Sequence, residues 1–262
     1  TTDAIDRHAQ DLDPQMRAEL EKQSELAKVQ MRQQVNDQVQ KAARKVLDWT
    51  IEPSDDELDY LTKDHPAMIS AFLIMLMMFV PFLTCLGGFN QTAGDIDTKG
   101  LRYLLIRTER SNIFLGRLIG TYLFAMAVFL ILFLVLGAYM ASNIKVHSPG
   151  EMLAWMASGY LRVMLFVAPY MAVCAWISCA IASPFGSLAI SLLIVYFYPL
   201  IIYIGSKSAD AISYGNLATP WGYKWWLFAP LGPKFFGGIA MMIAFTALFT
   251  FLGHRYFGKR DL

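Results

Sequence analysis

Charged and apolar residues alternate in one short stretch, between residues 94 and 117. The carboxylates Asp95 and Asp97 come first, near the N-terminus of a predicted helix over 95–106, where the helix dipole favours negative charge. Three leucines lie on one face of this helix, and basic residues surround them. The leucines are Leu101, Leu104 and Leu105, and the basic residues are Lys99, Arg102, Arg107, Arg110 and Arg117. Such a helix can bind a partner protein, or it can lie at a membrane interface and contact anionic lipid.

Patterns that support catalysis or metal binding are absent from the sequence. There is no Gly-x-x-x-x-Gly-Lys-Ser/Thr phosphate loop, so we expect no ATP hydrolysis by this chain itself. There is also no Gly-x-Ser-x-Gly motif. The four histidines lack the spacing of metal ligands, and the 14 methionines are better explained by packing than by a soft-metal site. No catalytic residue, metal site or resident cofactor is therefore predicted.

The composition is that of a membrane protein with a polar segment at its start. Of the 262 residues, 56% are hydrophobic and 16% are charged, against about 25% charged in a typical soluble domain. The net charge of +1 hides a division. Residues 1–65 carry 9 Lys/Arg and 15 Asp/Glu, whereas residues 66–262 carry 13 Lys/Arg and 6 Asp/Glu. We therefore expect an acidic polar segment over 1–65 and a basic membrane domain over 66–262.

Long stretches without Asp, Glu, Lys or Arg indicate five membrane-spanning helices. About 20 apolar residues cross a bilayer as a helix, and the longest stretch, 163–206, divides in two at Ser183-Pro184-Phe185-Gly186. The predicted spans lie near 67–88, 118–140, 163–182, 186–205 and 235–253. The expected fold is an all-α polytopic membrane protein, because continuous apolar runs differ from the alternating strands of a barrel. Uncharged span interiors argue against an ion-coupled transporter and against an intramembrane enzyme.

The distribution of Lys and Arg predicts the orientation of the spans. The 94–117 loop and the C-terminal tail together carry eight basic residues, whereas the loops on the other side carry four. By the positive-inside rule, the 94–117 loop and the C-terminus are therefore expected in the cytoplasm. Because five spans put the two ends of the membrane domain on opposite sides, residues 1–65 are expected on the extracytoplasmic side. Because a polar segment of this length does not cross a bilayer unaided, we expect a sixth helix upstream of Thr1.

Three segments outside the spans each allow more than one interpretation. An apolar stripe predicts an amphipathic helix over 14–50, which lies on the protein's own surface, binds a partner or a second copy, or contacts lipid. A short interfacial helix is predicted over 149–161, followed by Arg162, which either snorkels to the headgroups or faces a pathway. Aromatic residues over 207–234 indicate an interfacial belt with short or re-entrant helices, or else a ligand-binding box. The stripe consists of Val35, Val39, Ala42, Val46 and Trp49.

Three cysteines fall inside the predicted spans, where they are interpreted as small buried hydrophobes. They are Cys85, Cys174 and Cys179. Their positions give no disulfide framework, so no disulfide is predicted.

The stretch between residues 94 and 117 resembles the signature of the ABC-2 type transporter permease family. That signature contains an acidic pair, a glycine, a Leu-Leu pair and an arginine before a span that begins with Gly-Lys or Gly-Arg. The corresponding residues here are Asp95, Asp97, Gly100, Leu104, Leu105, Arg110, Gly116 and Arg117. The C-terminal Tyr-Phe-Gly-Lys-Arg-Asp-Leu is also similar to the basic endings of such permeases. The resemblance covers the chain from about residue 66 to the end.

The resemblance implies a non-catalytic permease subunit of an ABC exporter in a bacterial inner membrane. It implies six spans per permease, two permease copies in a homodimer or heterodimer, and two ATP-binding subunits that hold ATP and Mg. Residues 1–65 would be an enlarged external loop between spans one and two. The helix at about 95–108 would be the coupling helix, with the leucines as its apolar docking face. Asp95, Asp97, Arg102, Arg107 and Arg110 would set its polar contacts, and Arg117 would open the following span.

The alternative function is a membrane scaffold or assembly factor that performs no transport and holds a partner through its external helix. Co-purification of an ATP-binding subunit would distinguish the exporter from the scaffold. The expected partners are that subunit, a second permease copy, membrane lipid and an extracytoplasmic partner for residues 1–65. No nucleic-acid partner is expected, and no pattern in the sequence indicates the transported substrate.

Overall fold

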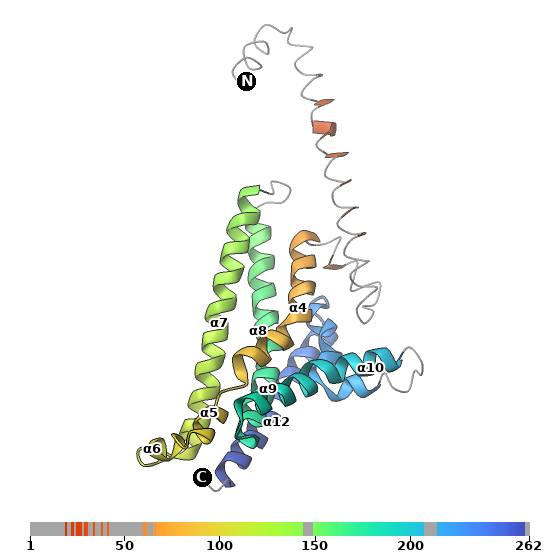
Figure 1. Cartoon of the computed structure of the whole chain (residues 1–262). Helices are drawn as coiled ribbons and strands as arrows, with labels where there is room; N and C mark the ends of the chain where they lie inside the picture. The colour runs from red at the N-terminus through yellow and green to blue at the C-terminus, as the bar shows by residue number, and fades with distance from the viewer. Residues whose placement is uncertain are drawn as a thin grey trace. The chain divides into compact units, whose positions relative to one another are not determined.

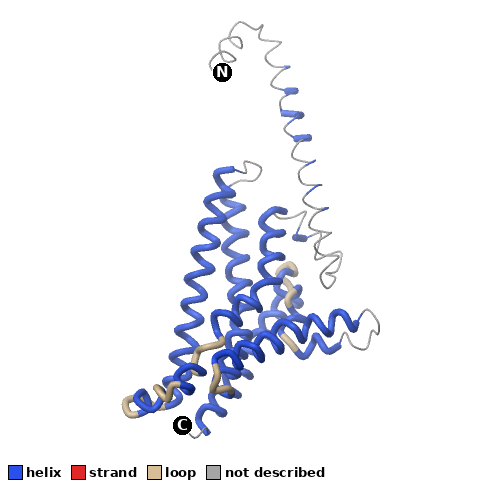
Figure 2. Tube along the Cα trace, viewed as in Figure 1, coloured by secondary structure: helices blue, strands red, loops and turns tan. Residues whose placement is uncertain are grey.

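The computed structural model describes residues 60–61, 65, 67–143, 149–206 and 214–259, together with scattered positions between Glu19 and Lys41. Over these residues every regular element is a helix and none is a strand (Figure 2). The all-α class expected from the sequence is therefore confirmed. The chain divides into two compact units, Thr1–Thr50 and Ile51–Leu262, so the boundary falls earlier than the predicted one after residue 65.

In the first unit the described positions, from Glu19 to Lys41, are helical and exposed. Leu26 and Val29 are among them, and both are about half exposed. The apolar stripe predicted between Val35 and Trp49 lies outside the described residues.

Among its described residues, the second unit contains five helices that are long and apolar enough to cross a membrane. They are α4 (Ala67–Gly88), α7 (Arg110–Asn143), α8 (Pro149–Ala180), the continuous run α9 (Pro184–Leu192), η1 (Leu193–Phe197) and α10 (Tyr198–Ser206), and α12 (Pro233–Lys259). Every predicted span coincides with one of these helices to within about two residues or lies inside it. The chain is therefore a multi-pass membrane protein.

The longest apolar stretch breaks where the sequence predicts. The Ser183 hydroxyl caps α9 by accepting a hydrogen bond from the N–H of Gly186 at 3.4 Å. Pro184 occupies the first turn, where its missing N–H removes no helix bond. Beyond the break, η1 is a π-helical turn between α9 and α10. In Figure 1 the run from α9 to α10 leads away from α7 and α8 at a steep angle.

Helix α8 lies at the centre of the second unit and packs against α4, α7 and α12. Its most apolar window is 78% buried inside the protein, against 11% for α7 and for α12. The close packing depends on small residues, because a Cβ at Gly159 would come within 2.6 Å of the Leu73 side chain of α4. A separate interfacial helix over 149–161 is not observed. Those residues are the first turns of α8, which continues without a break through Arg162 to Ala180.

Residues just before α4 also belong to this unit. Leu61 is fully buried. The ring of His65 stacks on the indole of Trp155 at 3.6 Å, and Tyr60 meets both rings edge-on. These contacts explain why the unit begins before residue 65.

Candidate functional site

The stretch predicted to form one coupling helix over 95–108 instead forms two short helices, α5 (Ala93–Asp97) and α6 (Leu101–Leu105). The chain breaks between them because Lys99 adopts a left-handed conformation with φ of 57°. Gly100 then leads into α6. The prediction of a single helix is therefore wrong, although the helical character of both halves is correct. Figure 1 shows α5 and α6 beside the C-terminal end of α12.

Polar contacts attach the start of this stretch to α8 and α9. The Ser178 hydroxyl of α8 accepts hydrogen bonds from the N–H groups of Thr92 at 2.8 Å and Ala93 at 3.0 Å. It thereby satisfies N–H groups at the start of α5, which have no partner within the helix. The Ser187 hydroxyl of α9 donates to the carbonyl of Phe89 at 2.8 Å. The position of α5 therefore depends on two spanning helices.

An ion pair attaches the same stretch to α7. The Arg117 guanidinium pairs with the Asp95 carboxylate and also donates to the carbonyl of Gln91. Both charged side chains are partly exposed. The sequence places Asp95 and Arg117 in one signature, and the structure brings these two residues, one from α5 and one from α7, into direct contact.

An apolar cluster lies under α6 and includes one of the predicted docking leucines. Leu101 is 1% exposed and therefore packs inside the protein's own core. Its neighbours come from α7, α8 and α12, and they are Ile113, Phe114, Ala175, Cys179 and Phe257. Leu105 packs partly against the same cluster. The assignment of Leu101 to a docking face is therefore corrected: this leucine attaches α6 to the spanning helices and offers no surface to a partner.

The beginning of α7 is also joined to the end of α12. Arg110 donates a hydrogen bond to the carbonyl of Gly258 at 3.2 Å. The Nε2 atom of His254 lies 2.8 Å from the hydroxyl oxygen of Ser111. The predicted site residue Arg110 thus contacts the C-terminal helix, whereas Arg117 contacts α5.

The exposed side chains of the stretch include both apolar and charged ones. Ile106 is 81% exposed and Leu104 is 43% exposed. Asp97 and Arg107 are exposed as well. Arg102 lies within α6, and its side chain is outside the described residues. Ile106 was not among the residues predicted from the sequence. Its position between a Leu-Leu pair and an arginine was the signal that could have identified it.

A basic residue outside the 90–117 stretch, Arg162, is buried inside the second unit. Its side chain is 5% exposed, with the guanidinium carbon 5.1 Å from the ring centre of Trp155 and 5.0 Å from that of Phe235. The hydroxyl of Tyr60 is a hydrogen-bond partner. Arg162 therefore does not snorkel to lipid headgroups, because the protein's own aromatic rings enclose it. Cation–π contacts replace part of the lost hydration.

The aromatic segment after α10 forms three short 3₁₀ helices, η2 (Tyr214–Ala218), η3 (Pro220–Tyr223) and η4 (Trp225–Phe228). The predicted short helices are therefore present, but their rings pack inward instead of forming an exposed belt. The buried aromatic residues are Trp221, Tyr223, Trp225 and Phe228. Lys224 is buried among them, and its burial lowers its pKa from 10.5 to about 7. Nothing in the sequence distinguished this lysine from an exposed one.

The three cysteines are all described and all are buried, as predicted, and none of the three forms a disulfide. Within the described residues, no three His, Cys, Asp or Glu side chains gather in a way that could hold a metal ion.

No protein-family model matches the chain, and no curated protein matches it either. The functional interpretation therefore depends on the residues of the 90–117 stretch and on their geometry.

Proposed function

We propose that the chain is the permease subunit of an ABC exporter, located in a bacterial inner membrane with its C-terminus in the cytoplasm. A separate subunit would bind ATP and Mg, and a second permease copy would complete the assembly. The chain itself would perform no catalysis. Its five apolar helices and the signature over residues 95–117 support this proposal.

The attachment of the α5–α6 stretch to the spanning helices is the observation that carries the proposal. The stretch contacts α8 through Ser178, α7 through Arg117 and α12 through the cluster around Leu101. We call the exposed residues around Ile106 the tip of the stretch. A force applied at this tip would reach three spanning helices through direct contacts. This is the arrangement that a coupling element requires, because it must pass a displacement from outside the membrane to the spans.

Energy transfer adds a thermodynamic requirement. The ATP-bound and ATP-free states of the partner must bind the tip with different free energies, since only a differential interaction shifts the equilibrium between two conformations of the permease. The exposed apolar side chains Leu104 and Ile106 would supply the contact area. The charged side chains Asp97 and Arg107 would set the orientation of the partner.

The substitution Ile106→Glu tests the proposal. Ile106 is 81% exposed, so a charge there leaves the fold intact but should reduce binding of the ATPase by about tenfold. Leu231→Glu is the matched control, because Leu231 is 77% exposed and lies just before the opposite end of α12. The measurements are the amount of a phosphate-loop ATPase that co-purifies from native membranes, and the ATP hydrolysis of the complex.

Two results would contradict the proposal. One is the absence of any ATPase from the purified wild-type complex. The other is equal loss of the ATPase from both variants, which would show that the tip has no special role. A wild-type complex that instead contains a partner bound to residues 1–65 and no ATPase would support the membrane scaffold.

A further inference from the structure

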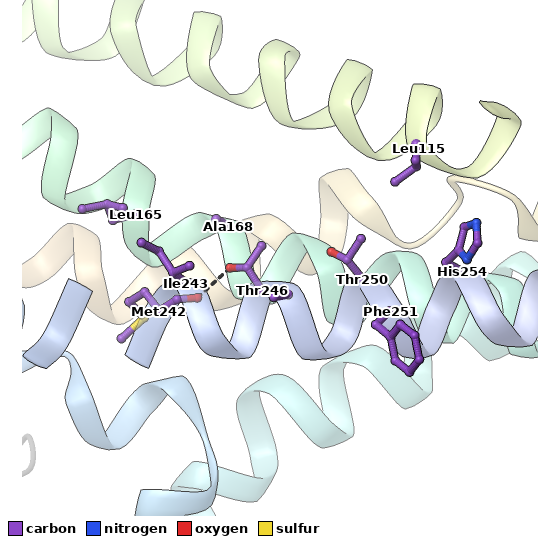
Figure 3. A pocket seen from close by; sticks show the side chains of 10 residues that line it. Leu115, Leu165, Ala168, Met242, Ile243, Thr246, Thr250, Phe251 and His254 are labelled. Atoms are coloured by element: carbon purple, nitrogen blue, oxygen red, sulfur yellow. Dashed lines mark hydrogen bonds between the residues drawn. The ribbon is translucent and has the colours of Figure 1, made fainter. Parts of the chain in front are cut away.

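A hollow of about 560 Å³ runs along one side of α12, where α12 faces α8 and the first turns of α7. Figure 3 shows Leu115 of α7 and Leu165 and Ala168 of α8 around it, with Ile243 and His254 on α12. The volume lies within the about 300–1,000 Å³ that is usual for ligand pockets. The hollow is large enough to accept a ligand chain, and its lining is almost entirely apolar.

The polar residues in the hollow are arranged along one side of α12. Thr246, Thr250 and His254 follow each other at intervals of four residues and lie on the side of α12 that faces α7 (Figure 3). The Thr246 hydroxyl donates to the carbonyl of Met242 at 2.7 Å, so it needs no partner from a ligand. His254, bonded to Ser111, closes one end of the hollow. The hollow is therefore an apolar groove with a polar end.

Basic residues gather at that same end. Arg255 and Lys259 occupy the last turns of α12 and are exposed. Arg110 at the start of α7 is half-buried and reaches the carbonyl of Gly258. Among the described residues, Glu109, which precedes Arg110, is the acidic residue of this region. The net charge of these four residues is positive even with Glu109 included, so the end of the groove is suited to an anionic group.

The length of the groove matches one leaflet of a bilayer. Its lining on α12 extends from Met242 to His254, which corresponds to about 18 Å of helix at 1.5 Å per residue. Half of a hydrocarbon core of roughly 30 Å is about 15 Å. An acyl chain that lies along the groove would therefore place its headgroup at the basic end, at the membrane surface next to the C-terminus.

We propose that this groove binds one acyl chain of an anionic phospholipid, whose phosphate lies beside His254 and Arg255. The proposal requires only that α12 crosses the bilayer, and it does not depend on the exporter function. The occupant is identified by two independent features, the leaflet-length apolar groove and the positive charge at one end.

A second hollow provides a matched control. It has a volume of about 630 Å³ and lies between α7 and α8, with Leu130, Phe133, Leu153, Met156 and Ala157 in its lining. None of its lining residues is charged, and the basic residue that follows them on α8, Arg162, is buried among aromatic rings instead of exposed. Apolar shape alone would attract lipid equally to both hollows, whereas charge complementarity distinguishes them.

The experiment measures lipid binding to the delipidated full-length chain by native mass spectrometry. Phosphatidylglycerol and phosphatidylcholine with identical acyl chains are added separately. We expect one phosphatidylglycerol per chain to bind at least about fivefold more tightly than phosphatidylcholine, the effect expected for one nearby basic residue. Ala247→Trp fills the groove from an exposed position and should weaken this binding about tenfold. Ala157→Trp in the second hollow should leave it unchanged.

Arg255→Gln provides a test that removes the charge without adding volume to the groove. It should weaken phosphatidylglycerol binding about fivefold and leave phosphatidylcholine binding unaltered. Equal binding of the two lipids, or equal effects of Ala247→Trp and Ala157→Trp, would overturn the proposal. So would an Ala247→Trp variant that binds the lipid normally but no longer dimerises, because the groove would then be covered by a second copy of the chain. If Ala247→Trp does not fold, Arg255→Gln decides the question.

Discussion

Lys224 shows how strongly the local packing changes the behaviour of one charged residue. Its Nζ atom lies 4.1 Å from the ring centre of Trp221 and 5.2 Å from that of Trp225. The Sδ atom of Met78 is 3.6 Å away. The side chain is 2% exposed, so its ammonium group has lost almost all of its hydration. The aromatic rings compensate for part of this loss.

The lowered pKa of Lys224 predicts a pH dependence of stability. Between about pH 7 and pH 10.5 the unfolded chain holds a proton that the folded chain has released. The free energy of unfolding should therefore rise with pH through this window and stay at its lower level below pH 7. Lys224→Met should raise the melting temperature at pH 7 and abolish this rise. Thermal unfolding in detergent at pH 7, 8 and 9.5 measures both effects.

The control for this prediction is Lys234→Met, because Lys234 is exposed and lies at the start of α12. It should leave the pH dependence unchanged. A wild-type melting temperature that is constant from pH 7 to pH 9.5 would show that Lys224 keeps its proton in the folded chain.

At the scale of the helices, glycines decide how closely the spans approach each other. A Cβ at Gly253 of α12 would lie 2.7 Å from the ring of Phe114 and 3.3 Å from the Cα of Trp176. The second of these atoms belongs to the backbone of α8, which cannot move alone. Gly120 of α7 differs, because a Cβ added there would have no atom of a neighbouring element within 4 Å.

Alanine substitutions at these two glycines should therefore have opposite effects. Gly253→Ala should lower the free energy of unfolding by about 1–3 kcal/mol, because the new methyl group overpacks the contact between α12, α7 and α8. Gly120→Ala should leave stability unchanged or raise it by up to about 1 kcal/mol, since alanine favours a helix over glycine. Melting temperatures of the two variants in the same detergent provide the comparison. A Gly253→Ala protein as stable as the wild type would mean that α12 is packed less closely.

The sequence predicted the spans well because membrane insertion depends on the summed hydropathy of about 20 residues, which is a property of composition. It failed at Lys99, because a left-handed conformation at a single lysine leaves no signal in the hydrophobic periodicity. It also failed at Leu101 and Arg162. Whether a leucine faces a partner or the core, and whether an arginine reaches water, depends on which helices lie beside it. The pairing of Asp95 with Arg117 was likewise not predictable from their spacing alone.

For the whole molecule, the unequal burial of the spans is the main feature. Helix α8 is enclosed by its neighbours, whereas only 11% of the most apolar window of α7, and of that of α12, is buried within this chain. Apolar surface of this extent is stable only against lipid or against another protein. The second unit is therefore built for a bilayer, and its outer helices are available to further copies or subunits.

Impermeant thiol labelling of intact cells tests the proposed orientation. The native cysteines are buried, so the background labelling should be low. Cysteines placed at Ser24 and Leu231 should react from the outside, whereas a cysteine at Ile106 should react only after the cells are opened. Protection of Ser24→Cys and reaction of Ile106→Cys in intact cells would reverse the orientation and place the α5–α6 stretch outside the cytoplasm.

The π-helical turn η1 has a consequence for the faces of the helix that follows it. Its hydrogen bonds run from residue i to i+5, so each bonded loop holds one more residue than in an α-helix. Removing one residue from 193–197 would restore an α-helix and leave the side chains of α10 on nearly the same faces, because the wider turn accommodates the extra residue. A one-residue deletion should therefore be tolerated at this turn, whereas the same deletion within α9 would turn every later side chain of the span by about 100° (360° over 3.6 residues).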